Sequence, residues 1–428
     1  MSSKQRVVVR GPALTQSGYG EHTRMILRAL KTREDLFDVY ILPSNWGHTG
    51  WTSEKDELRE WIDFRINQTQ QYHNFCSQNK QNPTYDVSFQ VSIPSEWERM
   101  AIQNIGVTAG IETTKVSPEW LMKGNEMDKI IITSNHSKYV YENTTYEGSD
   151  QAGNPATLTL QTPIEVVGYP ARNLQPKEEI DLNLKYDFNY IFVGQWGPRK
   201  NIDNMIKWWL EENWEEKVGL VLKVSHRKNN HRDRLYTSSR IKHLLNSVNL
   251  DQSERKCKLY LLHGDLKENE MVSVYHHPKI KCMISATHGE GFGLPLFDFA
   301  QVGKPIVATD WSAHLDFLTH EQDNGKINKP FLPVSYDIAP IPKEAVWKGI
   351  LEEESMWAYP HEGSFKHRLR QVRKNKKWLE RAKKNVDNIM NKFDEEKVYA
   401  MVVDAVHREN IDIDAWLENL ESEVVENE

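Results

Sequence analysis

The residues with the clearest chemical potential lie in one glycine-rich segment, HGEGFGLPLFDFAQV. Gly289, Gly291 and Gly293 predict a flexible turn after a strand, and LPLFDFAQV predicts the start of a helix. Glu290 lies in this turn, and Asp298 lies eight residues later in the helix. Carboxylates accept hydrogen bonds from vicinal hydroxyl groups, and backbone N–H groups at a helix N-terminus favour phosphate. The segment therefore predicts that one carboxylate binds a sugar and the other a ribose, because core packing alone leaves a carboxylate between glycines unexplained.

A second segment, VGQWGPRKNIDNMI, places two cations beside the start of a helix. A predicted buried strand ends at Gly194, Arg199 and Lys200 follow in a short loop, and Asn201 is expected to cap the next helix. Two cations beside a helix N-terminus at the carboxyl edge of a parallel sheet meet the needs of a diphosphate. The alternative, two exposed basic residues in a surface loop, remains open at this point.

A third segment, RGPALTQSGYGEHTR, is a weaker candidate. A strand is expected to end at Arg10 and a helix to begin near Glu21, with Gly18, Tyr19 and Gly20 at its entrance. Glycines there allow backbone N–H groups to approach an anion closely. The spacing is not that of a G-x-G-x-x-G fingerprint, so a tight turn without a binding role is about equally well supported.

Short β-branched runs alternate with helical patterns along the whole chain and must position these residues. Such runs read as nearly continuous apolar segments, which is typical of parallel strands covered by helices on both faces. The fold class expected is therefore α/β, with two doubly wound, Rossmann-like domains facing across a cleft. The strand candidates are residues 7–9, 39–42, 87–91, 130–133, 164–167, 190–193, 220–224, 259–262, 283–286 and 306–308.

The length of 428 residues indicates two domains of ordinary size. Residues 145–189 are polar and contain Gly and Pro, so they are the most linker-like part of the chain, and the boundary is expected close to Pro170. We predict an N-terminal domain at 1–170, which would bind the acceptor, and a second at 171–365, which would bind a nucleotide sugar. Residues 366–428 are expected to form C-terminal helices that pack back on the N-terminal domain.

The charge of the chain is unevenly distributed. Its 54 basic and 61 acidic residues give a formal net charge of −7, and seven of the acidic residues lie in the last eighteen positions. Residues 365–385 hold ten Lys or Arg against one Glu. This stretch would suit a phosphate backbone, although a solvated helix face is the commoner meaning of such a run, so the overall acidity does not exclude an anionic partner.

The chain shows no stretch resembling a membrane span and no signal-peptide core, so we expect no integral membrane contact. Its three cysteines, Cys76, Cys257 and Cys282, lie far apart and lack the spacing of a zinc site. We therefore expect a reduced cytoplasmic setting, or the host cytoplasm if the protein is viral, and no bound metal.

The segment HGEGFGLPLFDFAQVGKPIVAT resembles the E-x7-E region of the family 4 glycosyltransferases, which are two-domain retaining enzymes of the GT-B fold that use nucleotide sugars. SGYGEHTR is similar to the N-terminal glycine-rich loop of that family, VGQWGPRKN to its diphosphate loop, and LLHGDLKENEMVSVYHH to the segment flanking the nucleotide base. NIGVTAGIETTKVSPEWLMKGNEMDKIIITSNHSK, ATDWSAHLDFL and SMWAYP resemble a subgroup from bacterial polysaccharide clusters and T4-like phages. The resemblance covers nearly the whole chain.

The resemblance implies a role for each matching residue. Lys200 and Arg199 would neutralise the diphosphate leaving group, and Glu290 would hold hydroxyl groups of the donor sugar, so these three are the expected catalytic residues. The expected substrate-binding residues are Gly18, Tyr19, Gly20, Glu112, Gln195, Asn201, Leu262, Leu266, Gly291, Phe292, Gly293, Leu294 and Asp298.

This sequence departs from the family pattern at three places. Asp298 stands where the family usually has Glu, and its shorter reach puts the ribose contact in question. Gln195 stands where many members have Arg, which leaves Arg199 to supply that charge. Glu112 occupies the region of the N-terminal cleft where many members have a histidine.

The function implied is a retaining hexosyl- or pentosyltransferase that moves a sugar from a nucleoside diphosphate donor, UDP-linked, to a hydroxyl group of a glycan or polysaccharide. The nucleotide sugar is a co-substrate, and no cofactor is expected. One alternative is a phage enzyme that glycosylates hydroxymethylated pyrimidines in DNA, to which the basic stretch 365–385 would contribute. Another is a binding protein for nucleotide sugars that has lost transfer, in line with the departures at Asp298 and Gln195.

Overall fold

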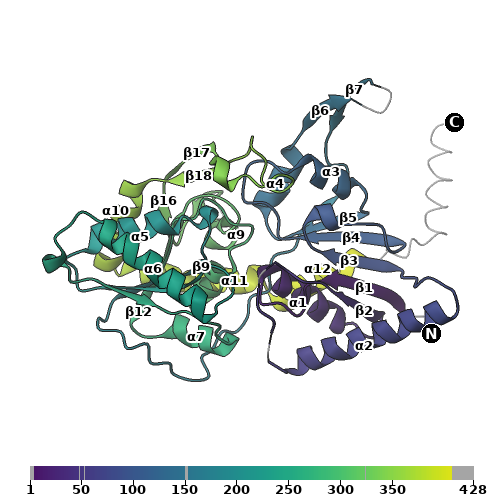
Figure 1. Cartoon of the computed structure of the whole chain (residues 1–428), viewed down its shortest axis with the longest axis horizontal. Helices are drawn as coiled ribbons and strands as arrows, with labels where there is room; N and C mark the ends of the chain where they lie inside the picture. Colours follow the sequence, from purple (N-terminus) through teal and green to yellow (C-terminus); the bar gives the residue numbers. More distant parts are fainter. Residues whose placement is uncertain (1–3, 48, 53, 150–152, 323, 407–428) are drawn as a thin grey trace.

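The protein forms two α/β halves that lie side by side (Figure 1). We call residues 4–166 the N-terminal half and residues 189–392 the C-terminal half; residues 167–188 link them. The computed structural model describes residues 4–47, 49–52, 54–149, 153–322 and 324–406.

The N-terminal half is built on a six-stranded, all-parallel sheet with the order β2-β1-β3-β4-β5-β8. Its inner strands are buried on both faces, as the apolar runs predicted. The strands are β1 (Gln5–Gly11), β2 (Phe37–Pro43), β3 (Val87–Val91), β4 (Gln103–Thr108), β5 (Lys129–Ile132) and β8 (Ile164–Val166). The helices are α1 (Gly18–Lys31), α2 (Glu57–Gln78), η1 (Pro94–Glu96), α3 (Pro118–Asn125) and α4 (Asn135–Asn143), and β6 (Tyr146–Ser149) pairs with β7 (Pro155–Leu158) in a separate hairpin.

The C-terminal half has a second six-stranded parallel sheet, with the order β11-β10-β9-β12-β13-β16. Counted within this half the order is 3-2-1-4-5-6, the order of dinucleotide-binding domains. The strands are β9 (Asn189–Gln195), β10 (Gly219–Ser225), β11 (Lys258–Leu261), β12 (Ile280–Ser285), β13 (Ile306–Thr309) and β16 (Leu332–Val334). The helices are η2 (Pro198–Lys200), α5 (Ile202–Asn213), α6 (His231–Ser247), η3 (Gln252–Glu254), α7 (Glu268–His276), α8 (Leu294–Gln301), α9 (Leu315–Leu318), η4 (Lys343–Ala345), α10 (Glu362–Lys374) and α11 (Lys377–Lys392). Two small hairpins pair β14 (His320–Glu321) with β15 (Ile327–Asn328) and β17 (Tyr336–Pro340) with β18 (Met356–Pro360).

The predicted fold class is confirmed, and each of the ten predicted strand runs overlaps an observed strand. Two strands of the six-stranded sheets, β4 and β16, were missed, as were the strands of the three small hairpins. β4 carries Gly106 within QNIGVT, and β16 has only three residues, one of them Pro333. Proline is tolerated there because β16 lies at the edge of its sheet. Each sheet reverses its strand order at one point, between β1 and β3 in one half and between β9 and β12 in the other, and ligands of such sheets bind beyond the carboxyl ends of those strands.

The prediction of a linker over residues 145–189 is wrong in part. Its first third forms the β6–β7 hairpin, which projects from the N-terminal half (Figure 1). Further along, Tyr169, Ala171 and Leu184 are buried. The polar composition masked these few apolar residues, which pack against both halves. The domain limits at 170 and 365 remain predictions; residue 365 lies within α10.

The chain returns to the N-terminal half at its end. α11 lies against α8. α12 (Glu395–Val406) lies against α1, as Figure 1 shows. Gln103 at the start of β4 donates a hydrogen bond from Nε2 to the carbonyl oxygen of Ala405, at 3.2 Å. The acidic tail noted in the sequence lies outside the described residues.

The basic stretch 365–385 is divided between α10 and α11, and the cations of α10 that face α5 are paired. Three glutamates, in the last turn of α5 and just beyond it, neutralise them. The pairs are Lys366 Nζ to Glu211 Oε2 at 2.6 Å, Arg370 Nη1 to Glu212 Oε2 at 2.5 Å, and Arg373 Nη1 to Glu216 Oε2 at 3.1 Å.

Candidate functional site

A cleft of about 1010 Å³ lies between the halves and is lined by both. The N-terminal half contributes the first turn of α1 and the loop after β2. The C-terminal half contributes the loop after β9, the turn after β12 and the first turns of α7 and α8. Thirteen of the sixteen predicted site residues line this cleft: Gly18, Tyr19, Glu112, Gln195, Arg199, Lys200, Leu266, Glu290, Gly291, Phe292, Gly293, Leu294 and Asp298.

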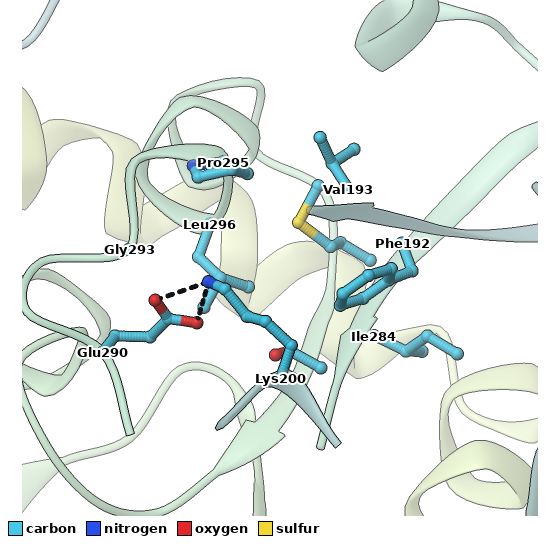
Figure 2. Close-up of a pocket in the computed structure, with 10 residues that line it drawn as sticks. Phe192, Val193, Lys200, Ile284, Glu290, Gly293, Pro295 and Leu296 are labelled. Atoms are coloured by element: carbon cyan, nitrogen blue, oxygen red, sulfur yellow. Dashed lines mark hydrogen bonds and ion pairs between the residues drawn. The ribbon is translucent and has the colours of Figure 1, made fainter. Parts of the chain in front are cut away.

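Glu290 is the centre of an ion cluster in the cleft. Lys200 Nζ lies 2.6 Å from Oε1 and 2.7 Å from Oε2 of this carboxylate, as Figure 2 shows. Arg199 Nη1 lies 2.9 Å from Oε2. The side chain of Glu290 is only 6% exposed. η2 carries both cations beyond the end of β9, so the loop and the turn predicted separately from the sequence meet at one point.

The two cations keep Glu290 ionised. Burial raises the pKa of a carboxyl group, but the charges of Lys200 and Arg199 outweigh burial here and lower the pKa of Glu290 to about 2. The backbone of Glu290 is also fixed, because its N–H group donates to Ser312 Oγ at 2.9 Å. Glu290 is thus a permanent, oriented anion at neutral pH, suited to accept hydrogen bonds from hydroxyl groups.

Arg199 also joins the two halves. Its Nη2 atom lies 3.2 Å from Oε1 of Glu112, in the loop after β4, while its Nη1 atom donates to the carbonyl oxygen of Gly289 at 2.7 Å. Glu112 and Glu290 therefore share one guanidinium group across the cleft. The sequence placed both acids in the site, but only the docking of the halves pairs them through Arg199.

Gly289 and Gly291 in the turn allow the N-terminal half to approach closely. The sequence had suggested instead that these glycines make the turn flexible. A Cβ atom on Gly289 would lie 2.3 Å from the carbonyl oxygen of Glu112, and one on Gly291 would lie 2.6 Å from that of Ala109. Thr133 Oγ1 adds a hydrogen bond of 3.0 Å to the carbonyl oxygen of Gly291. Any larger residue at either glycine would push the halves apart.

Gly293 has a different role, because its φ of +94° is a left-handed conformation at the N-cap of α8. Between these glycines Phe292 is buried and packs on Tyr169, with ring centroids 4.9 Å apart. Its ring therefore anchors the turn in the core, while α8 starts at Leu294 on the cleft wall.

Asp298 lies in α8 and is paired with a residue that the sequence did not single out. Arg172 Nη2 lies 3.1 Å from its Oδ1 atom. Burial raises the pKa of Asp298 to about 6, against the opposing charge of Arg172. The second acid of the E-x7 pattern thus has a setting unlike that of Glu290.

The glycine-rich entrance forms the first turn of α1, which begins at Gly18 and not near Glu21 as predicted. Ser17 caps it by accepting a hydrogen bond from the N–H group of Gly20, at 2.9 Å. Tyr19 stacks on Trp46 with ring centroids 4.0 Å apart, and its hydroxyl group lies 2.7 Å from Thr108 Oγ1. The ring of Tyr19 is thereby held on the N-terminal wall.

Three predicted site residues do not line the cleft. Gly20 packs under the turn, where a Cβ atom would lie 2.2 Å from the carbonyl oxygen of Thr15. Asn201 is at the N-cap of α5 with φ +52° and makes no side-chain cap; its Nδ2 donates to the carbonyl oxygen of Ala286 instead. Leu262 packs against the hydrophobic core.

Gln195 lines the cleft, and its Nε2 atom donates to the carbonyl oxygen of His226 at 3.1 Å. It supplies no charge, so Arg199 and Lys200 are the cations next to Glu290.

Sequence reasoning named no role for Arg172 or Ser312. Arg172 lies within the linker-like residues 145–189 and Ser312 within the segment ATDWSAHLDFL, but neither residue type is distinctive by itself. Ser312 has a φ of +82°, an unusual backbone conformation for serine, which aims its hydroxyl group at the glycine turn. No sequence signal marks that conformation.

Among the described residues, no three His, Cys, Asp or Glu side chains gather in a way that would hold a metal ion. In the same part of the chain, no helix is both long and apolar enough to cross a membrane.

The chain is similar to solved structures over 94% of its length. One is sucrose-phosphate synthase from Thermosynechococcus elongatus, with a TM-score of 0.59 and 11% identity over 98% of that chain. Anabaena HepE in complex with UDP and glucose has a TM-score of 0.55 and 11% identity over 99% of that chain. A glycosyltransferase from Rickettsia africae has a TM-score of 0.56 and 12% identity over 98% of that chain.

No protein-family model and no curated protein sequence matches the chain. At identities of 11–12% the structural likeness concerns architecture. With two doubly wound parallel sheets facing a shared cleft, the chain has the GT-B fold.

Proposed function

We propose that the protein is a retaining glycosyltransferase that moves a sugar from a UDP-sugar to a hydroxyl group of a glycan or polysaccharide. The observation that carries this proposal is the buried Glu290 carboxylate, bound by Lys200 and Arg199 on the cleft wall. This arrangement offers an anion for sugar hydroxyl groups directly beside two cations for a diphosphate.

UDP is the nucleotide proposed because similar structures hold it. HepE is described in complex with UDP-glucose, and a further similar structure, from E. coli, is described as bound with UDP-2-fluoro glucose. In our proposal the diphosphate lies between Lys200 and the N-terminus of α8, where backbone N–H groups beyond Gly293 favour negative charge. Asp298, one turn further along α8, receives the ribose.

The chemical step breaks the bond between the sugar C1 and the diphosphate oxygen, and the bonding electrons leave with the diphosphate. The acceptor oxygen forms the new bond to C1, and its proton passes to the departing phosphate. Negative charge grows on the diphosphate while the sugar becomes oxocarbenium-like, as in glycoside hydrolysis. Lys200 and Arg199 stabilise that growing charge, and Glu290 orients the sugar through its hydroxyl groups.

A glycan is the acceptor we favour over hydroxymethylated DNA. The DNA alternative drew on the basic stretch 365–385, and three of its cations are already paired with glutamates near the end of α5. We expect the reaction in a reducing cytoplasm, because Cys76, Cys257 and Cys282 are buried and unpaired.

The proposal is tested by incubating the protein with a panel of UDP-sugars, with and without glycan acceptors, and measuring released UDP. The anomeric configuration of the product, read by NMR, reports retention or inversion. Glu290→Gln should abolish release, whereas Glu165→Gln is a matched control, since Glu165 pairs with Lys129 and does not line the cleft.

A parent protein that binds UDP-sugars in calorimetry but releases no more UDP than Glu290→Gln would be a binding protein without transfer. Transfer to hydroxymethylated DNA but to none of the glycans would support the phage-type alternative. A parent that binds no nucleotide would contradict the proposal entirely.

A further inference from the structure

Arg172 lies in the linker, which packs here against the C-terminal half, and it makes two hydrogen bonds to α8. Its backbone N–H group donates to Gln301 Oε1 at 2.7 Å, and its Nη2 atom lies 3.1 Å from Asp298 Oδ1. Gln301 in turn donates from Nε2 to the carbonyl oxygen of Phe297 at 3.2 Å, so its own side chain is fixed. These contacts hold the guanidinium group at one place beside Asp298.

The second arm of the guanidinium group, Nη1, is bound by Glu268 in the first turn of α7. Arg172 therefore bridges the two helices that form the cleft wall beyond the glycine turn. Its side chain is 28% exposed and itself lines the cleft. Two ion pairs, one on each arm and each to a different carboxylate, restrict rotation of the group more than a single ion pair does.

The contact with Arg172 occupies only one of the two carboxylate oxygens of Asp298. Oδ1 accepts from Arg172, whereas Oδ2 has no hydrogen-bond partner among the residues that the structure describes. Asp298 lines the cleft together with Leu294 and Pro295, the residues that open α8. One oxygen is thus engaged and the other is free to accept from a ligand.

The surroundings of Asp298 otherwise oppose its ionisation. Burial raises its pKa to about 6, and the nearby charges of Glu21 on α1 and Glu268 on α7 act in the same direction. Tyr275, also on α7, faces the same carboxyl group and is neutral, because burial raises its pKa as well. The cation that counteracts all of these is Arg172.

We infer that Arg172 is a positioning residue for the donor nucleotide, which holds Oδ1 of Asp298 so that Oδ2 accepts hydrogen bonds from the ribose hydroxyl groups. This inference rests on the proposed function. It also accounts for the shorter acid at this position: the guanidinium group pins the carboxylate at a set place, so a longer side chain is not needed to find the ribose.

The test is a thermodynamic cycle in which the affinities of two nucleotides are compared between the parent protein and one variant. The affinities of UDP and of 2′,3′-dideoxy-UDP, which lacks both ribose hydroxyl groups, are measured by calorimetry at pH 8 for the parent and for Arg172→Gln. The parent should bind UDP about tenfold more tightly than the dideoxy analogue. Arg172→Gln should lose about tenfold in UDP affinity and less than twofold in dideoxy-UDP affinity, so that its preference for ribose falls below about twofold.

Two further variants make the result specific. Arg172→Lys retains a cation but not the fork, and it should recover about half of the lost ribose preference on a logarithmic scale. Arg370→Gln removes an arginine paired with Glu212 outside the cleft, and it should leave both affinities unchanged. Affinity for inorganic pyrophosphate should stay within twofold in all of them.

Each outcome has a definite meaning. Equal losses for UDP and dideoxy-UDP in Arg172→Gln would show a merely structural brace and overturn the inference while leaving the proposed function standing. A retained tenfold preference for ribose in that variant would overturn it too. A parent that binds neither UDP nor UDP-sugars would overturn the proposed function, and the inference with it.

Discussion

The turn that carries Glu290 is followed directly by α8, which carries Asp298, yet the pKa of one carboxyl group is lowered and that of the other is raised. Lys200 and Arg199 both contact Glu290 and lower its pKa to about 2. Asp298 has one cation, which it shares with Glu268, and burial raises its pKa to about 6. Burial is common to both, so the cations set the difference in pKa: Glu290 contacts two, whereas Asp298 contacts one that also pairs with Glu268.

The difference assigns distinct tasks to the two acids. A carboxylate with a pKa near 2 does not exchange protons at physiological pH, so Glu290 acts as a fixed hydrogen-bond acceptor and charge. Asp298 changes its charge close to neutrality, so we expect any contact that it makes with a ligand to depend on pH.

Glu290→Gln should reduce the kcat/KM of sugar transfer at least a hundredfold, which is about 3 kcal/mol of transition-state stabilisation. The amide lacks the charge and half of the acceptor capacity, and its N–H₂ group faces Lys200 and Arg199 at contact distance. Steady-state release of UDP measures the loss. Rates within threefold of the parent would remove Glu290 from the site.

Lys200→Ala should weaken UDP binding about tenfold to a hundredfold and slow the chemical step as well, because charge on the diphosphate grows in the transition state. Arg199→Ala should cost less in binding, since Glu112 and the carbonyl oxygen of Gly289 already engage part of its fork. Calorimetry and kinetics measure both effects. Lys207→Ala is the control, because Lys207 lies on α5, the helix that follows η2, but outside the cleft. Unchanged affinity in both site variants would mean that the diphosphate binds elsewhere.

The affinity for UDP-glucose should be constant above about pH 7 and fall threefold to tenfold as the pH drops through 6. Asp298 becomes protonated over this range and no longer attracts ribose hydroxyl groups as an anion. UDP-glucose is the suitable probe because its diphosphate diester does not titrate there. In Asp298→Asn the affinity for UDP-glucose should not change with pH and should equal the low affinity of the parent below pH 6. If the affinity of this variant fell with pH as much as that of the parent, the titrating group would be another residue.

Asp298→Asn should also raise the stability of the protein, by up to about 3 kcal/mol at pH 8 and by little at pH 4. The pKa of Asp298 is about 6 in the folded protein against an ordinary value of 3.8. The folded state thus binds more protons between these values, and stability falls as the pH rises from about 4 to 6. Thermal unfolding at the two pH values measures this. A destabilisation that is larger at pH 8 than at pH 4 would show that the Arg172 contact outweighs the burial cost.

The smallest effect should come from the cations of α10 and α11, which lie far from either carboxylate in the chain and outside the cleft. Replacing Arg370, Arg373, Lys374 and Lys377 together by Gln should change glycan transfer less than twofold. Duplex DNA binding that falls steeply with salt in the parent, and that this variant loses, would contradict the glycan assignment and restore the DNA acceptor.

Much of the fold was readable from local patterns. The runs at residues 7–9 and 190–193 predicted buried parallel strands because β-branched residues without polar alternation need helices on both faces. β16 escaped notice because three residues with a central proline carry no periodicity. The linker prediction failed for a related reason: Tyr169 and Ala171 are too few to change the composition of their segment, although both are buried.

The sequence by itself determined the central part of the site. Glu290 among glycines, and Arg199 with Lys200 between a strand and a helix, are short-range patterns whose geometry follows from the end of one strand. Parallel strands bring their carboxyl ends to one edge, so the two patterns had to meet once the sheet formed.

Only the tertiary structure decided which charges meet across the molecule. Arg172 and Asp298 are 126 residues apart in the chain, and Glu112 reaches Arg199 from the other half. Gly289 and Gly291 are needed because backbone carbonyl oxygens of the N-terminal half lie so close to them that a Cβ atom at either position would clash. Such contacts depend on how two separately formed sheets dock, and that docking is set by many small side-chain contacts distributed over both halves, none of which is marked by spacing along the chain.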